Sequence, residues 1–229
     1  MSIEERVTRA TLSDQVESAI RRDIIDGLLP PGERLKPADL GQKYGVSATP
    51  LREALQRLAA RKLIDWDPRL GAAVAPVSVE GVRDIYWLRG LLEPVALQRS
   101  LEHGDDAWEN ELTTAWNVLR SAQRPKGRNG ETRAAAWSRA HGGFHEALMS
   151  AAQSPWLLRF IATLADHAER YAVLSARTST RDTLEEHGEL YRAAVARDVA
   201  GAVAALEHHL SATVAVVEQA FDGVPKDHR

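Results

Sequence analysis

The stretch GVSATPLREALQRL, residues 45–58, decides the fold of the first part of the chain, because it joins a tight turn to a short helix with two different faces. One face is apolar and has the i, i+3, i+4 and i+7 spacing of a helix side that packs inward. The other face carries long hydrogen-bond donors, which suit phosphate oxygens or base edges of DNA. Ordinary amphipathic helices have the same spacing, so the surrounding sequence has to decide between packing and recognition. The apolar positions are Leu51, Ala54, Leu55 and Leu58, and the polar side carries Arg52 and Arg57.

The elements around this helix complete a recognisable unit. Thr11 and Asp14 have the spacing of a capping box, which predicts a first helix that ends at Gly27. Ser47 is expected to be the N-cap of the quoted helix, and Pro50 lies in its first turn, where a missing amide hydrogen costs little.

A second helix is expected over residues 37–44, closed by Gly45, so that two helices and a short turn have helix-turn-helix spacing. Residues 63–66 and 72–75 are predicted to be strands around a turn at 67–71. Such a hairpin is a wing. A winged helix-turn-helix places its third helix in the major groove of DNA.

Composition bounds the class of protein. With 229 residues and 44% apolar content, the chain can form one large domain or two small ones. The absence of cysteine excludes disulfides and thiolate metal sites and fits a reducing compartment. No apolar segment is expected to approach the roughly 20 residues of a membrane span. The sequence therefore predicts a soluble cytoplasmic protein that does not interact with a membrane.

Charge is distributed unevenly along the chain. Residues 1–76 carry 12 Lys and Arg against 11 Asp and Glu, whereas the remaining residues carry 17 against 21. The net charge of -3 argues against wholesale coating of nucleic acid. Between residues 43 and 63, however, five basic residues accompany only one acidic residue, Glu53. The basic face is local, and it includes the predicted recognition helix.

The boundary between two domains is predicted at Pro76, which gives a winged helix-turn-helix domain over 1–76 and an all-helical domain over 77–229. Six or seven helices without a strand signal predict an antiparallel bundle, so the chain should be mostly α. Its first helix is expected to bury the stripe Val82, Ile85, Leu88, Leu92 and Val95. Further helices are expected near 105–122, 132–152, 155–177, 180–196 and 198–220, with a polar loop at 124–130.

Four histidines lie on predicted inward helix faces: His141, His145, His187 and His209. His141 and His145 are four residues apart and share one face, whereas His208 lies off the apolar stripe. Buried imidazoles need partners, and rings from three helices could hold Zn, Ni, Cu or Fe. Core histidines with ordinary hydrogen bonds are the alternative. The pair Gly142 and Gly143 could serve the close approach of a neighbour or a local kink.

Residues 11–76 resemble the DNA-binding signature of GntR-family bacterial repressors. The resemblance rests on IIDGLLPPGERL, residues 24–35, followed by the run from Gly45 to Leu55. It implies that Thr49 and Arg52 occupy DNA-contacting positions and that Gly71 marks the wing tip. Many relatives have Arg where this chain has Ala48, which bears on the choice of operator. The predicted DNA-contacting residues are Lys36, Ser47, Thr49, Arg52, Arg57, Arg69 and Gly71.

Residues 79–220 are similar to the FCD domain, the helical effector module of the FadR-type branch of this family. The marks that match are Arg89 with Glu93, the run Phe144 to Leu148, Glu186 with His187, Asp198, and His209 with Leu210. Many such domains hold a metal through Asp, His, His and His. The resemblance therefore implies the ligands His141, His145, His187 and His209, with His141 in place of the usual Asp. It also implies a small carboxylate effector, for which Arg89 and Arg170 are the candidate partners.

These expectations combine into a ligand-responsive transcriptional regulator, a repressor by the resemblance, and not an enzyme. A homodimer is expected to bind double-stranded operator DNA of pseudo-palindromic sequence and to hold a divalent transition metal, Zn or Ni. One alternative is a metal-dependent enzyme in which the histidines activate water. Another is a regulator whose bundle lacks metal and serves only for dimerisation.

Overall fold

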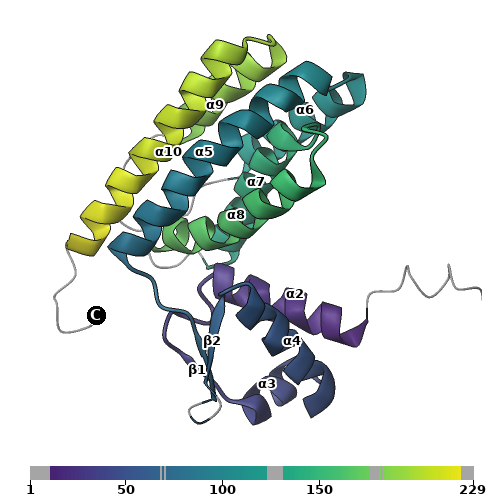
Figure 1. The fold of residues 1–229 in the computed structure, drawn as a ribbon, viewed down its shortest axis with the longest axis vertical. Helices are drawn as coiled ribbons and strands as arrows, with labels where there is room; N and C mark the ends of the chain where they lie inside the picture. Colours follow the sequence, from purple (N-terminus) through teal and green to yellow (C-terminus); the bar gives the residue numbers. More distant parts are fainter. Residues whose placement is uncertain are drawn as a thin grey trace, which may run out of the picture. The chain divides into compact units, whose positions relative to one another are not determined.

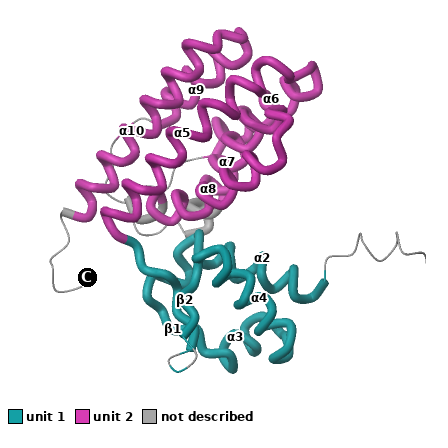
Figure 2. The backbone as a smooth tube through the Cα atoms, in the orientation of Figure 1, with its two compact units in different colours: residues 1–77 teal, residues 78–229 magenta. Residues whose placement is uncertain are grey.

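The structure, a computed structural model, describes residues 11–67, 69, 71–122, 131–175, 181 and 183–222. The chain divides into two compact units, residues 1–77 and residues 78–229, which Figure 2 shows in different colours. Each unit has its own buried core and is described by itself. The predicted polar loop at 124–130 lies outside the described residues.

The described residues of the first unit form three helices and a small sheet (Figure 1). Its core consists of the apolar faces of the helices, closed by one face of the sheet. Leu51, Leu55 and Leu58 are at most 1% exposed, which confirms the apolar stripe of the quoted stretch. The elements are α2 (Leu12–Ile25), β1 (Arg34–Leu35), α3 (Pro37–Tyr44), α4 (Ala48–Ala60), β2 (Ile64–Asp67) and β3 (Gly71–Val74).

The wing is a three-stranded antiparallel sheet with the order β1-β3-β2. The sequence predicted only the hairpin β2-β3. The third strand, β1, has two residues and exists because Arg34 and Leu35 pair with Ala73 and Ala72. Leu35 is buried, so β1 also contributes to the core.

Local capping signals decide where the helices of this unit begin and end. The capping box at Thr11 and Asp14 is present in both directions. Gly45 has a φ of 66°, a left-handed conformation that closes α3 and that glycine adopts without steric cost. Ser47 is the N-cap residue of α4, as predicted, but its side chain makes no capping hydrogen bond. That hydroxyl lies exposed at the start of α4.

The described part of the second unit contains six helices and no strand, which confirms a mostly helical protein with a winged helix-turn-helix followed by a helical domain. Figure 1 shows that α5 and α10 run side by side, and they are packed together with α8 and α9 in contact with α10. The helices are α5 (Val79–His103), α6 (Asp106–Ser121), α7 (Glu131–Met149), α8 (Pro155–Ser175), α9 (Thr183–Val195) and α10 (Val199–Asp222).

The inward face of α5 differs from the predicted stripe. Val95 is 50% exposed, and Ile85, Leu88 and Leu92 are only half-buried. The residues that point inward instead include the charged pair Arg89 and Glu93. The prediction was wrong because apolar spacing identifies the buried face only when that face is apolar, and here polar groups occupy part of it.

Helix α10 contradicts the expectation that no segment is apolar enough to cross a membrane. Among the described helices it alone, over Val199–Phe221, meets that criterion of length and composition. Within these residues the only acidic side chains are Glu207 and Glu218. Such a helix is weak evidence for a membrane span; α10 packs on α5, α8 and α9, although only 22% of the apolar window is buried.

We expect Leu55→Ala to lower the free energy of unfolding of the first unit by about 2–5 kcal/mol, because Leu55 is fully buried and its truncation leaves a cavity. Amide hydrogen exchange over residues 12–74 of the full chain measures this change. The matched control is Leu12→Ala in the same unit, because Leu12 is 51% exposed. Equal loss of protection in both variants would contradict the assigned core.

Candidate metal centre and DNA-contacting face

The four predicted histidines meet inside the second unit. His141 and His145 come from α7, His187 from α9 and His209 from α10. One ring nitrogen from each lies within 4.8 Å of the corresponding nitrogen of the other three. Three of the four residues are buried, and His141 is partly buried. Helical spacing therefore placed all four side chains on the correct faces.

The outer ring nitrogens of three histidines are fixed by oxygen atoms. His141 Nδ1 lies 3.1 Å from Glu169 Oε2, and His209 Nδ1 lies 3.0 Å from Glu186 Oε2. His187 Nδ1 contacts the backbone oxygen of Thr183. A carbonyl or ionised carboxylate oxygen only accepts hydrogen bonds, so each of these Nδ1 atoms carries the proton. Each Nε2 then has a free lone pair, which is the form that binds a metal.

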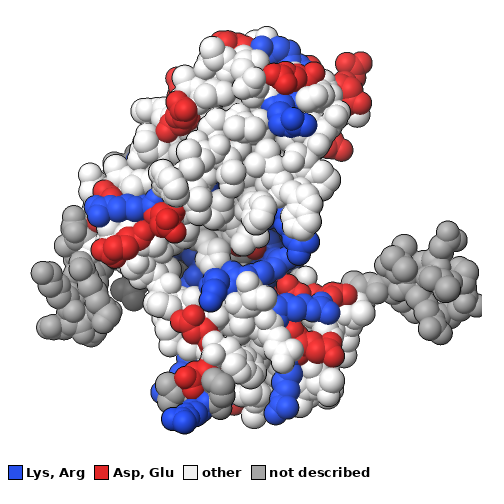
Figure 3. Space-filling view, viewed as in Figure 1, with Lys and Arg blue, Asp and Glu red and all other residues white. Residues whose placement is uncertain are grey.

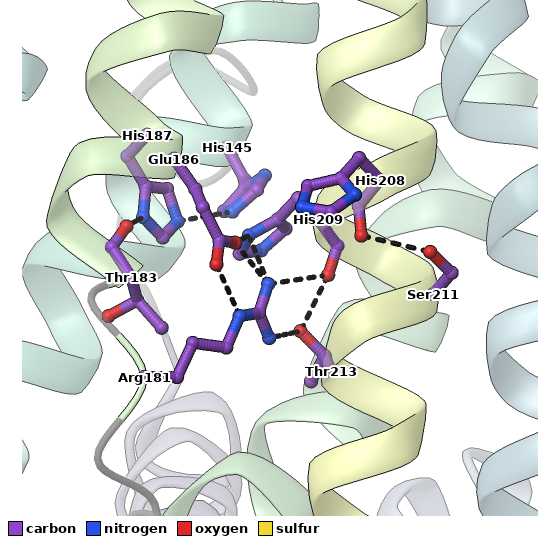
Figure 4. Close-up of polar contacts among 9 residues, drawn as sticks. All are labelled: His145, Arg181, Thr183, Glu186, His187, His208, His209, Ser211 and Thr213. Atoms are coloured by element: carbon purple, nitrogen blue, oxygen red, sulfur yellow. Dashed lines mark hydrogen bonds and ion pairs between the residues drawn. The ribbon is translucent and has the colours of Figure 1, made fainter.

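His145 is held differently. Its Nε2 lies 3.1 Å from His187 Nε2, and its buried Nδ1 has no hydrogen-bond partner among the described residues. Figure 4 shows His145, His187 and His209 with their rings turned toward one another. Because His187 Nε2 is unprotonated, His145 Nε2–H donates to it, and the converging ring nitrogens form a donor set that could hold a cation.

Burial keeps these rings neutral at pH 7. It lowers the pKa of His145 and His187 well below the usual value of 6.5, and the neighbouring histidines act in the same direction. Burial also lowers the pKa of His209 to about 4, although the hydrogen bond with Glu186 opposes this change. Neutral imidazole is the form of histidine that coordinates metals. At neutral pH these three rings therefore do not have to change from the charged to the neutral form before they bind a metal.

Carboxylates next to the cluster stay ionised. Burial would raise the pKa of Glu186, but hydrogen bonds from His209 and Arg181 outweigh it and lower the pKa to about 2. Burial likewise opposes ionisation of Glu169, and the charge and hydrogen bond of His141 lower its pKa nevertheless. His145, His187 and His209 are therefore neutral, and negative charge is supplied one step further out by Glu169 and Glu186.

The two predicted effector-binding arginines are both buried, Arg89 at 5% and Arg170 at 4% exposure. Arg89 forms a bidentate ion pair with Glu93 one helical turn away and lies over the ring of Tyr86, 4.8 Å from its centroid. Its positive charge is therefore already compensated within α5. The structure places Arg89 in the interior beside the histidines, where its charge contributes to the low pKa of His145.

The close approach suggested by Gly142 and Gly143 is not present. A Cβ at either position would meet no atom within 4 Å, and α7 is helical across both residues. The approach of a neighbouring group therefore does not account for these glycines.

The predicted DNA-contacting residues of the first unit lie on its surface, with one of them engaged elsewhere. Arg52 is exposed on α4, on the side opposite the buried leucines. Arg57 Nη1 contacts Asp14 and lies 3.6 Å from Glu17, both on α2. The structure thus gives Arg57 a role in holding α4 against α2. The other exposed members of the set are Lys36, Ser47, Thr49, Arg69 and Gly71, and Gly71 has a φ of 85°.

Sequence reasoning did not identify the residues that contact the Nδ1 atoms of the histidines. Glu186 was noted beside His187 as a mark of the resemblance, but its contact with His209 was not predicted. Glu169 and Arg181 gave no signal, since each is separated from its histidine by 28 residues. Their contacts follow from how α8 and Arg181 lie against the histidine-bearing helices.

A winged helix-turn-helix joined to a helical unit with a buried polar site defines a DNA-binding transcriptional regulator. The comparisons with known proteins agree: the pattern of the bacterial regulatory proteins of the gntR family matches residues 12–74, and the FCD domain matches residues 84–212. The chain belongs to the GntR family, in its FadR-type branch with a C-terminal FCD domain. It is a regulator that binds DNA through the winged unit, and not an enzyme.

Named relatives share most of the chain. The HTH-type transcriptional regulator BphR of Paraburkholderia xenovorans (strain LB400) is 35% identical over 202 residues, which cover 87% of this chain and 82% of BphR. The HTH-type transcriptional repressor GlaR of Escherichia coli (strain K12) is 29% identical over 89% of this chain and 94% of its own. The solved structure of E. coli McbR/YncC has the same fold, with a TM-score of 0.79 at 24% identity over 93% of this chain and 100% of that chain.

Acidification should destabilise the metal-free protein between pH 6.5 and about pH 4. Unfolded histidines bind protons near pH 6.5, whereas folded His209 does so only near pH 4, so the contribution is complete above pH 6.5 and is lost as the pH falls. His209 alone accounts for on the order of 3 kcal/mol. Urea unfolding of the chelator-treated protein at several pH values measures the effect. His208→Gln should retain it, since His208 is exposed, and a pH-independent free energy in this interval would rule out neutral burial.

Proposed function

We propose that the chain is a ligand-responsive transcriptional repressor that senses a small organic acid at a metal centre in its helical unit. The observation that carries this proposal is the convergence of His141, His145, His187 and His209 in a unit joined to a winged DNA-binding unit. We take residues 1–76 as the DNA-binding domain and residues 77–229 as the effector and dimerisation domain. Relatives named as repressors support the direction of control.

The metal would be held by the four Nε2 atoms. Four imidazole nitrogens suit Zn or Ni, and the carboxylate–histidine contacts at Glu169 and Glu186 are the kind of support that metal-ligating histidines have in proteins. When bound, the metal would supply a Lewis-acidic position for an oxygen ligand. The chain itself supplies the orientation of the rings and the exclusion of water.

The charge around the site favours an anionic effector. Glu93 pairs with Arg89 and Glu186 pairs with Arg181, and burial keeps His145, His187 and His209 neutral. A divalent cation would add positive charge that these two ion pairs do not compensate. A small carboxylate on the metal would supply negative charge, with Arg89 and Arg170 as the candidates for a second carboxylate group.

Helix α8 offers a path from this site to the start of the helical unit. Glu169 contacts His141, and two residues later the hydroxyl of Tyr171 accepts a hydrogen bond from the backbone N–H of Ser78 at 3.2 Å. Ser78 is the N-cap of α5 and follows the last residue of the first unit. A shift of α8 on effector binding would therefore also move Ser78, which directly follows the first unit in the chain. Such a response requires that the effector bind two arrangements with different affinity.

A homodimer would use the exposed apolar side of α5 and α10. Trp87, Leu91 and Val95 form a stripe along α5 and are 61%, 52% and 50% exposed. Beside them, a shallow groove of 440 Å³ runs between α5 and α10. Figure 3 shows that this side of the helical unit is largely uncharged over the middle of both helices. Contiguous exposed apolar surface marks an interaction site, and a two-fold partner would present two recognition helices to a pseudo-palindromic operator.

Arg52→Ala should weaken operator binding by about 1–3 kcal/mol per half-site, because an exposed Arg on the recognition helix contacts bases or phosphate directly. Gel shifts over a range of salt concentrations measure this change. Arg57→Ala should reduce affinity less, since Asp14 and Glu17 already bind its guanidinium. Arg120→Ala removes an exposed charge from the second unit and controls for net charge. An unchanged operator affinity of Arg52→Ala would contradict the assignment of α4 as the recognition helix.

Protein purified without an affinity tag should contain about one transition-metal ion per chain by elemental analysis. His145→Ala should remove most of it, because one ligand is lost and a void is left beside His187. His208→Ala, at the exposed neighbour of His209, should retain it. The metal centre would be contradicted if the wild-type protein contained no metal and also failed to bind added Zn²⁺ or Ni²⁺. The bundle would then serve for dimerisation without metal.

A further inference from the structure

Arg181 and Glu186 form a polar network on the Nδ1 side of His209. The Arg181 guanidinium makes two contacts to the Glu186 carboxylate, from Nε to Oε1 and from Nη2 to Oε2. Its remaining donors reach α10, where Nη1 lies 2.9 Å from Thr213 Oγ1 and Nη2 lies 3.0 Å from the backbone oxygen of His209. Figure 4 shows this network on the outer side of His209, away from His145 and His187.

The network determines which nitrogen of His209 carries the proton. Nη2 of Arg181 also lies 3.4 Å from His209 Nδ1, but its two hydrogens are already directed at Glu186 Oε2 and at the His209 backbone oxygen. Glu186 Oε2 lies closer to the same nitrogen, at 3.0 Å, and an ionised carboxylate can only accept. Nδ1–H of His209 therefore donates to Glu186, and the lone pair of Nε2 faces the cluster.

We propose that Glu186, held in place by Arg181, is a positioning residue that fixes the ring orientation and tautomer of His209 for metal binding. This inference rests on the proposed metal centre. It concerns groups that touch no metal, and it acts through the hydrogen bond between Glu186 and His209.

The carboxylate is well suited to this role because it cannot rotate away. Both of its oxygens are engaged by Arg181, and Arg181 in turn is tied to the backbone and a side chain of α10. Glu186 and Arg181 are 15% and 14% exposed, so water competes little with these bonds. Glu169 at His141 is less constrained, since its second oxygen, Oε1, has no hydrogen-bond partner among the described residues.

The arrangement also links two ligands across helices. Glu186 precedes His187 on α9, and its carboxylate binds His209 on α10. The same short segment of α9 therefore supplies one ligand and orients another. Loss of the Glu186 carboxylate should affect metal affinity more than it affects folding, because supporting carboxylates typically change metal affinity by about 10–100-fold.

The test compares Glu186→Ala, Glu186→Gln and a matched control, Glu185→Ala, in the full-length chain. Glu185 is the preceding residue of the same helix, carries the same charge, and pairs with Arg192 at the surface instead of with the histidines. Zn²⁺ affinity is measured by competition with a chromophoric chelator. The tautomer of His209 is read from nitrogen chemical shifts of ¹⁵N-histidine-labelled, metal-free protein at pH 7.5, with His209→Gln identifying the signal.

We expect Glu186→Ala to bind Zn²⁺ about 10–100-fold more weakly and to lose the single Nδ1–H tautomer of His209. Glu186→Gln should lie between Ala and wild type, because its amide oxygen still accepts a hydrogen bond without the charge. Glu185→Ala should match wild type in both measurements. Arg181→Met should reproduce part of the Glu186→Ala effect, since it frees the carboxylate.

Unchanged Zn²⁺ affinity or an unchanged His209 tautomer in Glu186→Ala overturns the inference. An equal loss in Glu185→Ala also overturns it, because removal of charge alone would then explain the effect. If the wild-type protein binds no Zn²⁺, the proposed metal centre is contradicted. The tautomer measurement on metal-free protein still tests the role of Glu186 separately. Circular dichroism identifies any variant that fails to fold, and Glu186→Gln, the closest isostere, then decides the question by the same two readouts.

Discussion

Three hydrogen bonds from histidine Nδ1 to oxygen are the constraint on which the helical unit depends. They involve Glu169, Thr183 and Glu186, and each one commits a ring to presenting its Nε2 lone pair to the others. Imidazole nitrogens that converge in a buried site form a donor set that suits a cation. The acceptors thus orient a set of core histidines so that they could hold a metal ion.

Helix α5 of the helical unit places a charged pair inside and large apolar groups outside. Arg89 and Glu93 lie on the inward face of α5, whereas Trp87 and Leu91 lie exposed on the same helix. Burying an ion pair costs more desolvation than burying apolar side chains, so such a core is poorly explained by stability alone. The proposed binding of a small charged ligand in the interior and of a second chain on the exterior would account for both features together.

The winged unit follows the opposite arrangement, with an apolar core and charge at the surface. Its recognition helix is held from within by Leu51, Leu55 and Leu58, and from the side by the contact of Arg57 with Asp14. Because Arg57 is engaged in this way, we propose Arg52 and the exposed start of α4, which includes Ala48, as the principal recognition surface.

The sequence by itself determined the features that depend on neighbours along the chain. Helical spacing placed the leucines of α4 inside and the four histidines on inward faces, and the residues at Thr11 and Gly45 marked helix ends correctly. Tertiary structure alone decided β1, which exists only through pairing with β3, and the inward face of α5. It also decided which oxygen meets which histidine. The physical reason is that local spacing defines a face, whereas the partner of that face depends on how separate helices are rotated and packed.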